Sequence, residues 1–299
     1  PTHRKAAILR DVDADDAAPV PHLPAGQLDI FSFVGGSQVG TCWHAIFEEI
    51  DFSAWAPGAE PSRRIEAVSM IDAILDRYRI CGRPGAPDTM TKKSIVHTMV
   101  GHVLSATLQD NAQRAFRLRD LAPADRRAEL DFDFRLRPWG ASGKGSHTGL
   151  VRDVLLAHWG HDPQKAAFVL SLMEWNREIP QGFMTGFIDL VFRRDGRYYI
   201  LDWKSNRRDG TAEAFSQEGL SEEMAAHAYY LQYLIYTVAV HHYLRGRVPG
   251  YGYDTHLGGV FYLFLRGIDP AAPGRGIFYD RPSAELIADL SAVLGDFAS

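Results

Sequence analysis

Cysteine is scarce in this chain: only Cys42 and Cys81 occur among its 299 residues, and they form no CxxC pair. Two separate thiols exclude a four-cysteine zinc or iron–sulfur site within the chain. No run of eighteen apolar residues occurs, and the start shows no signal-peptide pattern, so we expect a cytoplasmic protein without membrane contact. The loop at 140–146 lacks the spacing of a phosphate-binding P-loop, so we expect no ATP motor in this chain.

Positive charge is also in deficit, because 32 Lys and Arg residues stand against 37 Asp and Glu residues, a formal net charge of −5. This balance argues against a protein that coats nucleic acid by bulk electrostatics. Local positive charge gathers at Arg193, Arg194, Arg197, Lys204, Arg207 and Arg208. Such a cluster fits either a track for a phosphate backbone or a solvated hairpin tip.

Residues 186–204 carry the most informative pattern. Two runs rich in β-branched and aromatic residues flank Arg-Asp-Gly at 194–196, which predicts an antiparallel hairpin. Alternation places Asp189 on a strand face that should be buried and puts Asp202 and Lys204 side by side. Two carboxylates and an ammonium fit a site in which Mg²⁺ polarises a phosphodiester and the lysine stabilises developing charge. The alternative is a buried Asp189–Lys204 salt bridge with Asp202 at the surface.

The order Asp, then Asp-x-Lys one hairpin later, resembles the motif of the PD-(D/E)xK nucleases. The amino-acid sequence of this stretch further resembles the RecB-type nuclease domains of exodeoxyribonuclease V beta subunits, as do the sequences of residues 40–48, 231–237 and 258–267. The resemblance extends over about residues 34–299. It implies an α/β fold of the restriction-endonuclease type: a mixed central sheet flanked by helices, with a helical N-terminal insertion and an active edge at the hairpin.

The resemblance also implies the catalytic residues and the metal ligands. Asp189, Asp202 and Lys204 would be catalytic. The metal would be held by His44, Asp189, Asp202 and the backbone carbonyl of Trp203. Taken alone, a histidine at the edge of an apolar helix stripe is more often a packed core residue, and the matching Gly-Thr-x-x-His segment is what favours the ligand role for His44.

Three further residues are expected near the site. Gln232 and Tyr236 match a Gln-x-x-x-Tyr motif of RecB-like nucleases, and four-residue spacing puts them on one helix face, where they would order the site and position DNA. Tyrosines on a helix are also common packing residues. Glu129 begins an E-x-x-F pattern in a strand, and it either reaches the site or faces solvent.

Periodicity assigns the remaining segments. We expect strands at 129–136 and 258–265, and helices at 39–51, 62–78, 92–109, 148–159, 163–173, 221–245 and 283–297. Residues 1–30, acidic and rich in Ala and Pro, are interpreted as a linker or N-terminal extension. A RecB-type nuclease domain would follow at 31–299, with a helical part at about 37–125 and a catalytic core at about 126–299. The absence of an initiator methionine fits a fragment of a longer polypeptide.

The residues themselves predict metal-assisted hydrolysis, and the resemblance implies the Mg²⁺-dependent exodeoxyribonuclease domain of a RecBCD-type helicase–nuclease. It would hydrolyse phosphodiester bonds of mainly single-stranded DNA during double-strand-break repair, with one or two Mg²⁺ ions that Ca²⁺ or Mn²⁺ can replace. The implied partners are DNA, the helicase portion of the parent chain, RecC-like and RecD-like subunits and a RecA-type recombinase. The alternative is a catalytically weak nuclease fold that docks a recombinase or helicase.

Overall fold

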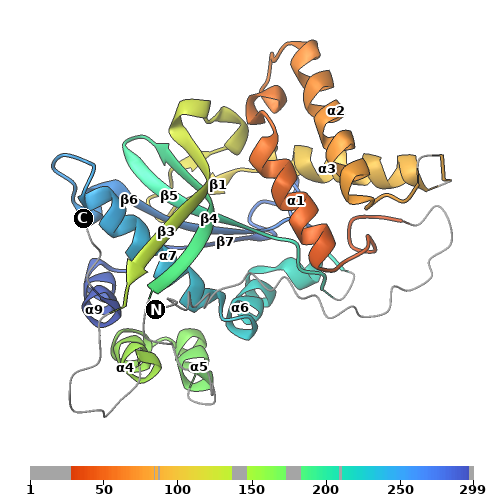
Figure 1. Ribbon diagram of the computed structural model, residues 1–299. Helices are drawn as coiled ribbons and strands as arrows, with labels where there is room; N and C mark the ends of the chain where they lie inside the picture. The colour runs from red at the N-terminus through yellow and green to blue at the C-terminus, as the bar shows by residue number, and fades with distance from the viewer. Residues whose placement is uncertain are drawn as a thin grey trace, which may run out of the picture.

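A five-stranded mixed sheet forms the centre of the computed structural model (Figure 1), which describes residues 28–83, 85–86, 88–136, 147–172, 183–208 and 211–295. The strand order is β3-β4-β5-β6-β7; β5 and β6 run parallel, and the other neighbours are antiparallel. The strands are β3 (Arg126–Arg135), β4 (Phe183–Arg194), β5 (Arg197–Lys204), β6 (Leu257–Phe264) and β7 (Ile277–Asp280). The predicted α/β fold with a mixed central sheet is confirmed.

Strands β4 and β5 form the predicted hairpin. Its turn residues Asp195 and Gly196 have φ values of 50° and 76°, which is the left-handed pair that a two-residue hairpin turn requires. The hairpin lies inside the sheet, because β3 pairs with β4 on one side and β6 pairs with β5 on the other. The expected active edge at the hairpin is therefore wrong: long-range pairing, which the local pattern does not reveal, covers both of its strands.

Helices cover both faces of the sheet (Figure 1). One face packs against α1 (Ser37–Glu49), α2 (Pro61–Tyr78) and α3 (Thr89–Ser105), together with the small hairpin of β1 (Leu108–Gln109) and β2 (Ala115–Phe116). The other packs against α4 (His147–Trp159), α5 (Pro163–Ser171), α6 (Gln217–Ala226), α7 (Tyr229–Arg245) and α9 (Ala284–Leu294), with the short α8 (Tyr253–His256) beside it. None of the helices described is both long and apolar enough to cross a membrane.

Helix α1 follows the predicted apolar stripe. Trp43, Ile46, Phe47 and Ile50 are all buried, and the ring of Phe47 stacks on Trp203 of β5 with the ring centroids 4.3 Å apart. Burial of this stripe fixes the helix over the C-terminal end of β5. His44, which follows Trp43, consequently lies at the C-terminal end of β5.

The predicted single helix at 221–245 is wrong, because the chain forms two helices. Helix α6 ends at Ala226, and α7 begins at Tyr229. Between them Ala228 has a φ of 55°, a left-handed conformation that costs a non-glycine residue roughly 1–2 kcal/mol. Apolar periodicity continues through the break, so the sequence carries no signal for it. The loop at 140–146 lies outside the described residues.

Candidate active site

The alternation of side chains between the two faces of the sheet is interrupted in β4 at Asp189. Ile188 packs in the core on the α7 side of the sheet, whereas Leu190 packs in the core on the α1 side. The residue across from Asp189 on β3 is Glu129, and its φ of 48° is left-handed. Strain of this kind in a strand needs the surrounding structure to impose it, and it is concentrated at functional sites. The two carboxylates thus share one irregular point of the sheet.

The side chain of Asp189 replaces a strand hydrogen bond. Regular pairing of β4 with β5 reaches Leu190 and Leu201. One step further, Asp189 Oδ2 accepts a hydrogen bond from the Trp203 N–H at 2.8 Å. The Asp189 side chain is only 9% exposed, so this bond holds the carboxylate in one place.

The ring of His44 connects α1 to the same point. Its Nε2 lies 3.0 Å from the Trp203 carbonyl oxygen, which can only accept, so Nε2 is the donor. Its Nδ1 lies 3.3 Å from Asp189 Oδ1. In a neutral ring Nδ1 would present a lone pair to a carboxylate oxygen, an arrangement that a cation between the two atoms stabilises. A ring N–H fixed by a backbone carbonyl is also the usual support of a metal-binding histidine.

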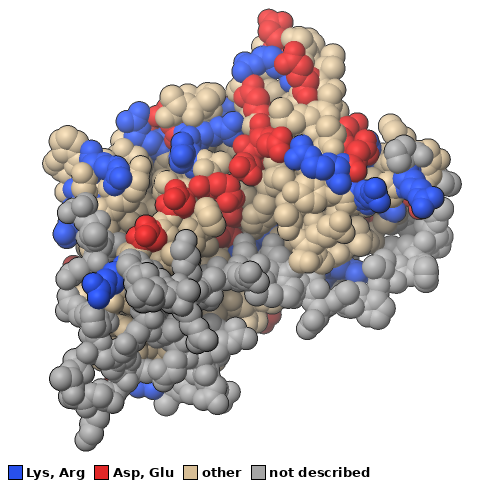
Figure 2. All heavy atoms as spheres, viewed as in Figure 1, with Lys and Arg blue, Asp and Glu red and all other residues tan. Residues whose placement is uncertain are grey.

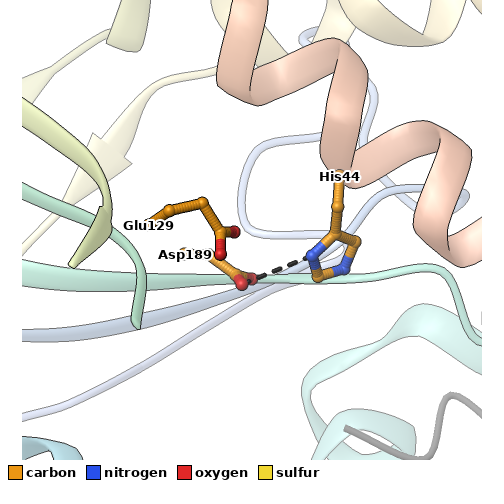
Figure 3. A group of neighbouring side chains, drawn as sticks. All are labelled: His44, Glu129 and Asp189. Carbon is orange, nitrogen blue, oxygen red and sulfur yellow. Dashed lines mark ion pairs between the residues drawn. The ribbon is translucent and has the colours of Figure 1, made fainter. Parts of the chain in front are cut away.

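Three side chains from three elements meet here (Figure 3). Ligand atoms of His44, Glu129 and Asp189 all lie within 4.8 Å of one another. One imidazole nitrogen and two carboxylates form a donor set that suits a divalent cation, and the residues present therefore fit the expected metal. Glu129, whose place the sequence left open, belongs to this group.

Asp202 and Lys204 lie outside this group. Their side chains point to the α7 side of β5, are 1% and 0% exposed, and form an ion pair with 2.7 Å between Oδ2 and Nζ. The alternative arrangement considered from the sequence, a bridge from Lys204 to Asp189 with Asp202 at the surface, is not the one observed. Asp202 remains adjacent to the group of His44, Glu129 and Asp189 through its backbone, because the peptide joining it to Trp203 donates the hydrogen bond to Asp189.

Two aromatic rings lie close to the ammonium of Lys204. Nζ lies 4.1 Å from the ring centroid of Tyr229 and 5.3 Å from that of Tyr262. The Tyr262 hydroxyl donates to Gln232 Oε1 at 2.8 Å, and Gln232 Nε2 donates to the Tyr236 hydroxyl at 3.0 Å. The Gln-x-x-x-Tyr pair thus reaches Lys204 through Tyr262. Sequence reasoning missed Tyr262, which stands beside Asp202 only because β5 and β6 pair in parallel.

A second polar chain leads from Lys204 towards the surface, and sequence reasoning did not find it. Asn206 Nδ2 donates to the Tyr229 hydroxyl at 3.2 Å and to Glu223 Oε1 at 2.9 Å. Glu223 is also paired with Arg208 and lies 3.1 Å from His227 Nε2. Arg208, which the sequence left open between a phosphate track and a hairpin tip, is therefore engaged in holding α6 against the end of β5.

Three other arginines of the cluster are engaged at the turn end of the hairpin. Arg193 forms an ion pair with Asp125 at 2.7 Å, and Arg194 lies 3.5 Å from the carboxylate of Asp195. Arg197 donates to two backbone carbonyls. Arg197 is five residues from Asp202, or about 16 Å along an extended strand. For these three arginines, the placement favours the interpretation as a hairpin tip over that of a phosphate track.

The thiol nearest the site is a core group. Cys42 on α1 is fully buried, and burial, with a smaller contribution from Cys81, raises the pKa of its thiol to about 12. A thiol with this pKa stays protonated at neutral pH and is a poor nucleophile or metal ligand. Cys81 is buried as well.

Comparison with known families decides the classification. The family described as the PD-(D/E)XK nuclease superfamily matches residues 34–294. The chain belongs to this superfamily. Among its relatives, the RecBCD enzyme subunit RecB of Escherichia coli (strain K12) is 34% identical over 280 residues, which are 93% of this chain and 20% of the relative.

Two further relatives carry the same name. RecB of Haemophilus influenzae is 33% identical over 95% of this chain and 21% of its own length, and RecB of Mycolicibacterium smegmatis is 30% identical over 94% of this chain and 25% of its own length. The chain therefore spans about a fifth to a quarter of these relatives. The resemblance to PD-(D/E)xK and RecB-type nuclease domains inferred from the sequence is confirmed.

Proposed function

We propose that this chain is a metal-dependent deoxyribonuclease domain of the RecB type. The observation that carries the proposal is the meeting of His44, Glu129 and Asp189 beside a hairpin strand that bears Asp202-x-Lys204. Family membership gives the reaction class, the hydrolysis of phosphodiester bonds, and the donor set gives the cofactor class. We propose Mg²⁺ as the physiological ion, because carboxylate ligands together with substrate phosphates suit it.

The three clustered side chains would hold the cation. When bound, a divalent cation supplies Lewis-acid polarisation of a phosphoryl oxygen and a nucleophile at neutral pH. His44 is oriented for this role by the Trp203 carbonyl, and Asp189 by the Trp203 N–H. We keep the Trp203 carbonyl as a proposed additional ligand, since a carbonyl oxygen has a second lone pair besides the one that faces His44.

Asp202 and Lys204 would act as a pair. With both charges buried, Lys204 neutralises Asp202. We keep Asp202 as a proposed metal ligand on the strength of the motif alone, and in that role it would leave the ammonium of Lys204 to stabilise negative charge on the reacting phosphate. Gln232 and Tyr236 act one step removed, by fixing Tyr262 against the ammonium.

The parent assembly is proposed from the relatives. Their names place them in the RecBCD enzyme. We propose that this chain is the nuclease part of a longer helicase-containing polypeptide, acts on single-stranded DNA in the cytoplasm with RecC-like and RecD-like subunits, and meets a RecA-type recombinase there.

A cleavage assay tests the proposal. End-labelled single-stranded and duplex DNA are incubated with the 299-residue chain in Mg²⁺, in Mn²⁺ and in a chelator. We expect products with either ion and none with the chelator, and exonucleolytic products that begin at a strand end. Cleavage in the chelator would overturn the metal dependence. A folded chain that fails to cleave with either ion while binding a recombinase or helicase would support the docking alternative instead.

A further inference from the structure

Phe187 stands exposed in the middle of β4. Its side chain is 61% exposed, whereas the next residue, Ile188, is fully buried. Large aromatic side chains usually lie in the core or at an interface, so an exposed one within a central sheet calls for a functional explanation. Phe187 makes no aromatic ring contact with the residues that the structure describes.

This phenylalanine lies next to the metal-ligand group. Ile188 packs in the core on the α7 side, so its neighbour Phe187 faces the α1 side of the sheet, where the Asp189 carboxylate meets His44. Its partner across the sheet is Asp131, which is two residues beyond Glu129 on β3. The ring therefore flanks the carboxylates that would hold the cation, on the side where His44 approaches.

The charges around Phe187 determine how a nucleic-acid strand can lie there. Asp131 and Asp133 are exposed on β3, and Figure 2 shows acidic side chains that follow this strand and continue towards the end of α1. These carboxylates repel phosphates, except where a bound cation compensates them. Bases are uncharged and carry flat apolar faces. A strand is accordingly favoured when one phosphate lies at the cation and the neighbouring base lies over the ring.

We infer that Phe187 is the platform on which an unpaired base beside the reacting phosphate stacks, so that the site selects single-stranded nucleic acid. The inference rests on the proposed nuclease function and adds a substrate contact to it. In a duplex each base is covered by its neighbours and must leave the stack before it can reach a side chain. In a single strand the base is free to stack on an exposed aromatic ring.

Binding in Ca²⁺ with the whole 299-residue chain tests this contact. A fluorescent oligothymidylate is titrated with the parent protein, with Phe187→Ala and with Phe187→Trp. Loss of one stacking contact weakens single-strand binding by about ten-fold or more. We expect that loss for F187A, retained affinity and quenched tryptophan emission for F187W, and no change in duplex binding for either. Tyr243→Ala, which removes an exposed aromatic on α7, is the matched control and should bind as the parent does.

An abasic oligonucleotide makes the test independent of folding. Removing single bases in turn should weaken binding to the parent at one position near the cleaved bond and should have no further effect on F187A at that position. If F187A binds every oligonucleotide as the parent does while the parent still cleaves DNA, the inference is overturned and the nuclease function stands. If the parent protein neither binds nor cleaves DNA with divalent ions present, both are overturned.

Discussion

The Asp189 carboxylate and the Trp203 N–H are joined by a hydrogen bond of 2.8 Å at the point where β4 and β5 stop pairing. A side chain there takes the place of a backbone acceptor and closes the end of the ladder. The same carboxylate faces His44 and Glu129, so one residue both completes the sheet and contributes to the site. Substitutions that separate these two roles are the most informative.

Asp189→Asn should keep the fold and lose the reaction. The amide oxygen can still accept from Trp203, but the negative charge that a cation needs is gone. We expect cleavage to fall by at least about a hundred-fold, the size of effect typical for removing one electrostatic contribution to catalysis, with Tm changed by little. Single-turnover cleavage and thermal unfolding of the same preparation measure both. Full Mg²⁺-dependent activity in a folded D189N protein would remove Asp189 from the mechanism.

Asp202→Ala should destabilise the protein, because it leaves the Lys204 ammonium buried without its carboxylate partner. Breaking a buried pair in this way costs about 3–5 kcal/mol. The double variant Asp202→Asn with Lys204→Met removes both charges and should recover a large part of that loss, while remaining inactive. Urea unfolding of the parent, single and double variants measures the difference. Equal midpoints for all three would show that the pair contributes nothing to the fold.

Divalent cations should stabilise the chain through His44, Glu129 and Asp189. A ligand at a hundred times its Kd adds about 2.7 kcal/mol to the native state, which corresponds to a rise in Tm of roughly 5 °C. We expect Glu129→Gln to abolish most of this rise. Asp133→Asn, on the same strand and outside the group, should retain it. An E129Q protein with the full Ca²⁺-induced rise would exclude Glu129 as a ligand.

Tyr262 should act on turnover through Lys204. Tyr262→Phe keeps the ring near the ammonium and loses only the hydroxyl that donates to Gln232, whereas Tyr262→Leu also loses the cation–π contact, worth roughly 0.5–2 kcal/mol. We expect kcat to fall in the order parent, Y262F, Y262L, with KM and the Ca²⁺-induced rise in Tm unchanged.

A control for this series is Tyr230→Phe, which alters a buried tyrosine of α7 that packs against Trp159 and Phe168. It should leave kcat as in the parent. A parallel loss of metal affinity in Y262F and Y262L would contradict a role confined to the ammonium.

The local pattern of the sequence was sufficient for the hairpin and for the helix that carries His44. Asp-Gly between alternating strands predicts a two-residue turn, and the stripe of Trp43, Ile46 and Phe47 predicts a helix with one buried face. Both are properties of neighbouring residues, since turn conformation and side-chain periodicity are local. The resemblance to the nuclease superfamily rests on these two segments together with residues 231–237 and 258–267.

Only the tertiary structure decided which side chains meet. Glu129 enters the site because its backbone is left-handed opposite Asp189, Tyr262 stands beside Lys204 because β6 pairs in parallel with β5, and the helix break at Ala228 sets the start of α7. Each depends on contacts between segments far apart in the chain. The spacing of neighbouring residues does not predict such contacts. The facing of Asp202 and Lys204 towards α7, away from His44, is a consequence of the same packing of two helical layers on one sheet.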